Sequence, residues 1–141
     1  MRQPKLFESH GPVLQIVLAI FVPALFGIVT GVVLGLSEIG YLVLAVPIGI
    51  GGGYFAGKEH LGAAEGAMRG FTGGILFGTF ILAADAATGM ERKAHLPEPD
   101  ALLVVLTTGF GVALGALGGR SRQRAETRLS SSTAPSSPPS S

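Results

Sequence analysis

Cysteine and asparagine are both absent from this 141-residue sequence. A chain without cysteine has no disulfide framework, no thiolate nucleophile and no cysteine metal site. A chain without asparagine has no N-glycosylation acceptor. Charged residues are also scarce, at 13% of the sequence, against roughly 25% in an ordinary soluble domain. These shortages direct attention to the apolar segments that make up most of the chain.

Four apolar segments are long enough to cross a bilayer as helices. The first, residues 13–36, has no ionisable group over 24 positions. At 1.5 Å per residue it would extend about 36 Å, which exceeds a hydrocarbon core of roughly 30 Å. A cleaved signal peptide is the competing interpretation, but its apolar core would be only about 7–15 residues long. The other segments are residues 39–57, 62–88 and 101–118. We therefore expect an all-α integral membrane protein, with a four-helix transmembrane bundle over residues 12–119 and a cytoplasmic lead at 1–11.

Glycine, at 22 residues, recurs at every fourth position within each segment. The rows are Gly27, Gly31 and Gly35; Gly49, Gly53 and Gly57; Gly62, Gly66, Gly70, Gly74 and Gly78; and Gly111, Gly115 and Gly119. In a soluble helix each interior glycine would cost about 1 kcal/mol relative to alanine. In a bilayer, glycines four residues apart form a groove in which a neighbouring helix can approach closely. The rows therefore predict GxxxG-type helix packing.

The row in the third segment is the longest, and two uses for it are open. Packing within one bundle accounts for the rows of three. Five glycines exceed what we expect one neighbour to use, so self-association into a homo-oligomer is the second use. A shift of 62 residues also places Gly49, Gly53 and Gly57 onto Gly111, Gly115 and Gly119. That match is typical of a repeat of two helical hairpins, although so much glycine could also produce it by chance.

The basic residues predict the orientation of the bundle, because Lys and Arg accumulate in cytoplasmic segments. With the N-terminus inside, the cytoplasmic basic residues are Arg2, Lys5, Lys58, Arg69, Arg120, Arg122, Arg124 and Arg128. Only Arg92 and Lys93 then lie outside. We therefore expect a multi-pass protein of the cytoplasmic membrane with both termini in the cytoplasm. Residues 120–141 are basic and then Ser/Pro-rich, which predicts a disordered cytoplasmic tail.

Three ionisable residues are candidates for transport or gating. Glu65 and Arg69 have the i, i+4 spacing of a helical ion pair, which could fix the depth of the helix or form a gate. Asp85 is the deepest acid, and it could reach the outer interface or bind a proton or cation. Pro23 predicts a kink in the first helix, one turn before Gly27.

Other kinds of chemistry are not expected. His10, His60 and His95 lie in three separate polar segments, without metal-ligand spacing. Residues 52–58 match a phosphate-binding loop, but Glu59 replaces the Ser or Thr that would hold magnesium, and a βαβ context is missing. The sequence has no evident nucleophile–base pair. We therefore expect no enzyme activity, no metal or other cofactor, and neither a nucleotide nor a nucleic acid as partner.

Residues 51–58 read Gly-Gly-Gly-Tyr-Phe-Ala-Gly-Lys, and a glycine-rich stretch follows at 62–78. This combination resembles a group of small, uncharacterised prokaryotic four-span membrane proteins, over roughly residues 12–119. The resemblance implies an integral membrane protein without an assigned reaction, so it transfers no functional residues. We expect a structural, interaction or self-associating component surrounded by membrane lipids. The alternative is a small transporter or channel subunit that uses Asp85 and the Glu65–Arg69 pair.

Overall fold

The computed structural model describes residues 6–132, and every regular element in this range is a helix. The elements are η1 (Phe7–Ser9), α1 (Pro12–Ile16), η2 (Val17–Phe21), α2 (Val22–Leu36), α3 (Glu38–Gly57), α4 (Ala63–Thr88) and α5 (Ala101–Ser132). Because α1, η2 and α2 run on without a break, they form one long helix, Pro12–Leu36. The prediction of four helices long and apolar enough to cross a membrane is confirmed.

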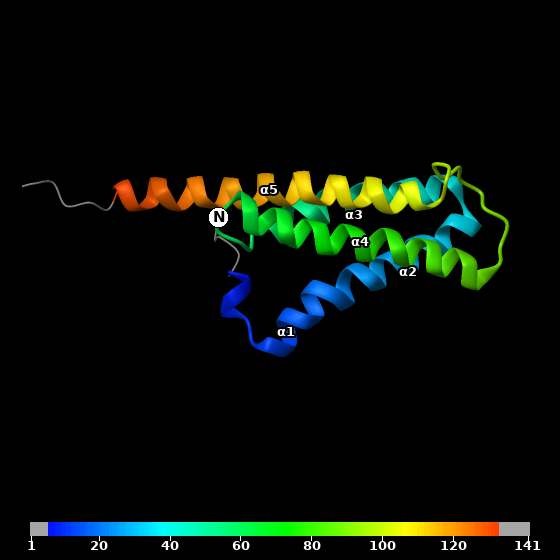
Figure 1. Cartoon of the computed structure of the whole chain (residues 1–141), viewed down its shortest axis with the longest axis horizontal. Coiled ribbons are helices and arrows are strands. Elements are labelled where there is room, and N and C mark those ends of the chain that lie inside the picture. Colours follow the sequence, from blue (N-terminus) through cyan, green and yellow to red (C-terminus); the bar gives the residue numbers. More distant parts are fainter. Residues whose placement is uncertain (1–5, 133–141) are drawn as a thin grey trace, which may run out of the picture.

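Helix α4 lies at the centre of the arrangement (Figure 1). It packs along α5 and against α2, whereas its contact with α3 is much smaller. The α2–α3 turn and the loop at residues 89–100 lie at one end of the molecule, and the α3–α4 connection lies at the other (Figure 1). Leu34, Tyr41, Phe77, Ile81 and Leu103 form a buried apolar cluster contributed by all four long helices.

The glycine row of α4 lies against α5 along its whole length. A Cβ atom on Gly66 would overlap the carbonyl oxygen of Gly115, and one on Gly70 would overlap that of Gly111. At the two ends, the backbone of Gly62 approaches Gly119, and Gly78 approaches the Thr107 hydroxyl. These contacts engage all five glycines of the row within one chain, although we expected one neighbour to use fewer.

The glycine rows of α2 and α3 lie against α4, the loop that follows α4, and α5. A Cβ on Gly27 would lie 2.6 Å from the Phe77 carbonyl oxygen, and one on Gly31 would overlap the carbonyl oxygen of Ile81. The absence of side chains at these two glycines therefore lets α4 approach α2 closely. A Cβ on Gly35 would lie 2.8 Å from the Cβ of Met90, in the loop that follows α4. In α3, Gly53 lies against Leu114 and Gly57 against Gly115, both in α5.

Gly49 does not pack, and the expectation that it would was wrong. A Cβ at this position would meet nothing within 4 Å. Its counterpart under the 62-residue shift, Gly111, lies against Gly70. The two related glycines therefore have different surroundings, because α4 is close to α5 and stands away from this part of α3.

The first long helix changes its hydrogen-bond register just before Pro23. Val22 donates its N–H to the Val17 carbonyl, five residues back, so residues 17–21 form a π-helical segment. Proline has no N–H, and its ring would clash with the carbonyl four residues earlier. A π-bulge is a common way to accommodate such a position.

Helix α5 extends past the predicted boundary. We expected the span to end at residue 118 and a disordered tail to begin at 120, but the helix continues to Ser132. Residues 120–132 contain neither Gly nor Pro, and Arg122 forms an i, i+4 ion pair with Glu126. Hydropathy marks where apolar residues stop, whereas residues with good helix propensity such as Arg, Gln, Ala and Glu can continue the helix beyond that point. Residues 133–141 lie outside the described range.

Candidate functional site

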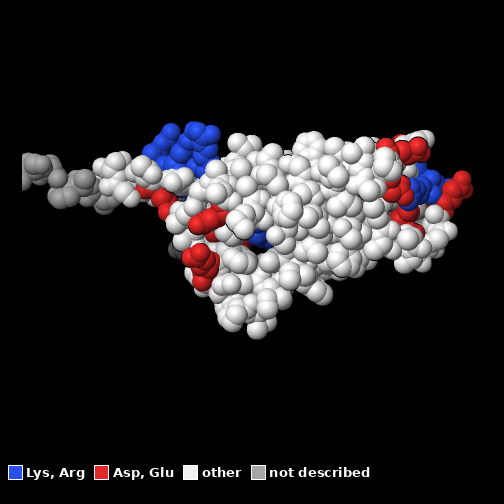
Figure 2. Space-filling model, viewed as in Figure 1, with Lys and Arg blue, Asp and Glu red and all other residues white. Residues whose placement is uncertain are grey.

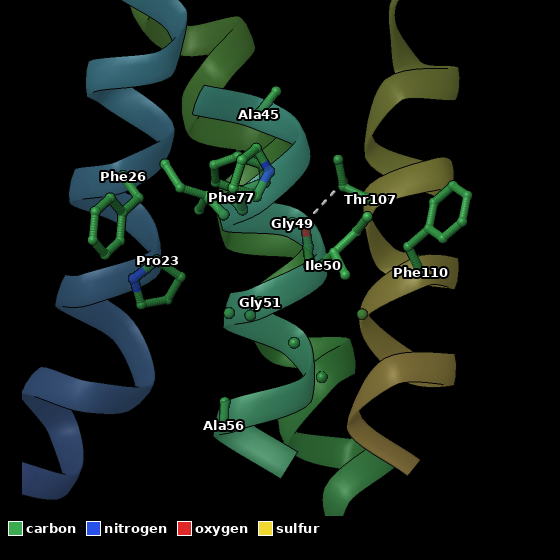
Figure 3. Close-up of a pocket in the computed structure, with 18 of the residues that line it drawn as sticks. Pro23, Phe26, Ala45, Gly49, Ile50, Gly51, Ala56, Phe77, Thr107 and Phe110 are labelled. Atoms are coloured by element: carbon green, nitrogen blue, oxygen red, sulfur yellow. Dashed lines mark hydrogen bonds between the residues drawn. The ribbon is translucent and has the colours of Figure 1, made fainter. Parts of the chain in front are cut away.

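A cavity of about 810 Å³ separates α3 from α4. Helix α2 lies along one side of this groove and α5 along the other (Figure 3). Pro23 and Phe26 line it from α2, Phe77 from α4, and Thr107 and Phe110 from α5. Its size falls within the range of about 300–1,000 Å³ that is usual for ligand sites.

The groove exists because α3 has few side chains where it faces α4. Gly49 and Gly52 have nothing within 4 Å of an ideal Cβ, and Gly51 meets only Phe55 of its own helix at 4.0 Å. Pro47, inside α3, also lines the groove. On α5, the Thr107 hydroxyl donates to the Gly74 carbonyl oxygen at 2.9 Å, which closes the far wall (Figure 3). A bulky side chain at Gly49, which also lines the cavity, would have occupied part of this space.

Arg69 provides the positive charge of the groove. It lines the cavity, and its Nη2 donates to the carbonyl oxygen of Leu18 in η2. That oxygen lacks a donor in its own helix, because Val22 donates to Val17 instead and Pro23, five residues on, has no N–H. The Nε atom of Arg69 is buried without a hydrogen-bond partner. The register change at Pro23 thus creates the acceptor that holds Arg69 in place.

Glu59, rather than Glu65, shares the groove with Arg69. Glu59 lines the cavity, and its backbone carbonyl accepts from the Phe7 N–H at 2.8 Å. Glu65 is exposed, and within residues 6–132 the ion pairs do not include Arg69. The predicted Glu65–Arg69 pair is therefore wrong, because the guanidinium turns towards the Leu18 carbonyl and the cavity.

Asp85 lies outside the groove, at the opposite end of α4. It is buried, and its Oδ2 accepts a hydrogen bond from Arg92 Nε at 2.8 Å within an ion pair. Arg92 also holds Asp100 through two hydrogen bonds of 2.7 Å. These bonds raise the pKa of Arg92 and hold the pKa of the Asp100 carboxyl below its ordinary value. The three residues form a latch between α4, the 89–100 loop and the start of α5.

Sequence reasoning identified Arg69 but missed its setting. The signal for the cavity was the glycine run at 51–53. Glu59 drew attention only as a mismatch in a phosphate-loop pattern, and Leu18 carries no side-chain signal at all. Within residues 6–132, no three His, Cys, Asp or Glu side chains gather in a way that could hold a metal ion.

No protein-family model matches the chain, and neither a curated protein nor a solved structure matches it.

Proposed function

We propose that the protein is a multi-pass integral membrane protein that holds one lipid molecule in the groove between α3 and α4. The observation that carries this proposal is the 810 Å³ cavity itself. Its walls are apolar over most of their length, and its charges come from Glu59 and Arg69. An apolar site with a few polar groups suits an amphiphile.

The surface of the helices supports a location in the membrane. Large apolar side chains are exposed on all four long helices, among them Phe21, Ile39, Phe71 and Phe110. Charged residues gather at the two ends of the molecule, apart from one small recessed patch (Figure 2). We propose the cytoplasmic membrane with both termini inside, because most of the basic residues then lie in the cytoplasm.

A binding role fits the contacts better than a purely structural or self-associating role. The expectation of self-association rested on the α4 row, whose five glycines face α5 of the same chain. Transport remains a second candidate only through Arg69, which lines the groove. Asp85, the other residue on which that alternative relied, is paired with Arg92.

Native mass spectrometry of the detergent-purified protein tests the proposal. We expect the wild type to retain one lipid, whatever its headgroup, after the detergent wash. Gly49→Leu should lose it, because the new side chain would enter the groove without meeting backbone. Gly109→Leu is the matched control, since Gly109 also has open space around it but lies outside the groove. Equal retention by both variants, or a wild type without lipid, would contradict the proposal.

A further inference from the structure

The groove has its two charges at one end and apolar walls elsewhere. Among the described residues that line it, Arg69 and Glu59 are charged, while Phe77 and Ile81 lie farther along α4. From Arg69 to Ile81 is about 18 Å along the helix, at 1.5 Å per residue. The cavity is therefore polarised in the same way as a lipid, with a headgroup end and a chain end.

The charged end of the groove lies near one end of its helices. Arg69 and the residue that anchors it, Leu18, are each six residues from the start of their helices, or about 9 Å. Helix α4, with 26 residues, extends about 39 Å against a hydrocarbon core of roughly 30 Å. With α4 centred on the core, Arg69 lies about 4–5 Å inside its cytoplasmic edge, below the glycerol level of that leaflet.

Arg69 needs an anion that the described chain does not supply at contact distance. Of the five N–H groups of a guanidinium, one donates to Leu18 and Nε has no partner. Within residues 6–132 the ion pairs leave Arg69 out. A cation withdrawn from water is costly unless an anion compensates it. Phosphate oxygens match the fork of donors on arginine.

Glu59 adds the opposite charge at the same end. It lines the same groove as Arg69 and, within residues 6–132, forms no ion pair with it. A purely anionic headgroup would satisfy Arg69 but would be repelled by this carboxylate. A headgroup that carries both a phosphate and an ammonium would complement both residues.

We propose that the occupant is a zwitterionic phospholipid with a primary amine, held with its phosphate at Arg69, its ammonium at Glu59 and an acyl chain between α3 and α4. This proposal rests on the proposed function and adds the headgroup and the two residues that recognise it. The lipid would enter sideways from the cytoplasmic leaflet. Arg69 anchors the phosphate, and Glu59 selects the amine.

Competition between two lipids with identical chains tests the proposal. The wild-type protein is equilibrated with equal amounts of phosphatidylethanolamine and phosphatidylglycerol, and the retained lipid is counted by native mass spectrometry. We expect phosphatidylethanolamine to be favoured. Glu59→Gln should reduce this preference about tenfold or more, because a charge-assisted hydrogen bond to the ammonium is lost. Arg69→Gln should reduce retention of both lipids.

Two controls keep the result specific to the groove. Glu65→Gln removes an exposed acid from the same end of α4, and Arg124→Gln removes an exposed arginine from α5; both should behave as wild type. Should Arg69→Gln fail to fold, the Glu59→Gln preference still decides the question.

The possible failures are distinguishable. A wild type that retains lipid without headgroup preference, or with a preference for phosphatidylglycerol, overturns the headgroup proposal and leaves the proposed function standing. A wild type that retains no lipid, or that carries a second copy of the chain instead, overturns both.

Discussion

At the scale of single residues, glycines in this chain differ sharply in what they do. Gly70 has the Gly111 carbonyl where its Cβ would be, whereas Gly109 has open space. Both are inside long helices, so the intrinsic cost of glycine is the same for both. Only the close approach of a second backbone distinguishes them.

Gly70→Ala should therefore destabilise the protein by about 1–3 kcal/mol, the usual cost of overpacking a tight contact. Gly109→Ala should be neutral or stabilising by up to about 1 kcal/mol, because alanine is the better helix former. Unfolding in mixed micelles of mild detergent and dodecyl sulfate would measure both changes. Equal effects of the two substitutions would mean that α4 and α5 are not in contact at Gly70.

Arg92 is the second residue whose role the contacts define. It joins the buried Asp85 to the exposed Asp100. Removing Arg92 would leave the Asp85 carboxylate buried without its cation. This destabilises the folded state more than replacing both partners by apolar residues would. The solvent exposure of Arg92 reduces this penalty.

We expect Arg92→Ala to lower the free energy of unfolding by roughly 1–3 kcal/mol. The same variant should also change the response to acid. Arg92 lowers the pKa of Asp100 in the folded state. The Arg92–Asp100 ion pair therefore makes its full contribution to folding stability at pH values above 3.8, the ordinary pKa of this carboxyl. This contribution is lost as the pH falls through the lowered pKa. Unfolding measured between about pH 5 and pH 2 should show this loss in the wild type and a weaker one in Arg92→Ala.

At the scale of elements, Pro23 connects two helices that are distant in the sequence. The proline shifts the register of η2, the shift frees the Leu18 carbonyl, and Arg69 of α4 donates to it. A backbone defect in one helix is thereby satisfied by a side chain of another. This link holds the first helix at the edge of the groove.

A double-mutant cycle would measure that link. In the wild type, Arg69→Gln should cost about 1–3 kcal/mol, because the Leu18 carbonyl is left without a charged donor. In the Pro23→Ala background we expect most of this cost to disappear, since the α register lets the Val22 N–H reach Leu18. Unfolding curves in detergent give the coupling energy between Pro23 and Arg69, which measures how far the Arg69 contact depends on the proline. Strictly additive effects would show that Pro23 does not create the acceptor.

At the scale of the whole molecule, charged residues of both signs are concentrated at the two ends of the long axis (Figure 2). Basic and acidic residues occupy both ends, and, apart from one small recessed patch, the surface between them carries no Lys, Arg, Asp or Glu on the face shown (Figure 2). The latch of Asp85, Arg92 and Asp100 marks one end. The α3–α4 connection and the extension of α5 mark the other (Figure 1).

The absence of cysteine allows the proposed orientation to be tested with single introduced thiols. His95→Cys, in the 89–100 loop, should react with a membrane-impermeant maleimide on intact cells. Arg124→Cys, in the extension of α5, should react only after the membrane is permeabilised. The reverse pattern would place the termini outside and would contradict the count of basic residues on each side.

The four long helices could be predicted from the sequence because apolar length is a local property. Residues 13–36 contain no ionisable group, and no tertiary contact was needed to see that they could cross a bilayer. The end of α5 could not be predicted in this way, since the polar residues after Gly119 continue the helix without the hydropathy signal. For the candidate site, the sequence pointed to Arg69 but assigned it the wrong partner, because i, i+4 spacing takes no account of an acceptor on another helix.

The sequence by itself determined the number of long helices, their approximate bounds and the positions at which two backbones could approach closely. All of these depend on residues near one another in the chain. Only the tertiary structure decided which glycines meet a neighbour and which open a cavity, because Gly49 and Gly111 follow the same local pattern and differ only in whether α4 reaches them. The groove, its two charges and the carbonyl that anchors Arg69 exist because separate helices meet.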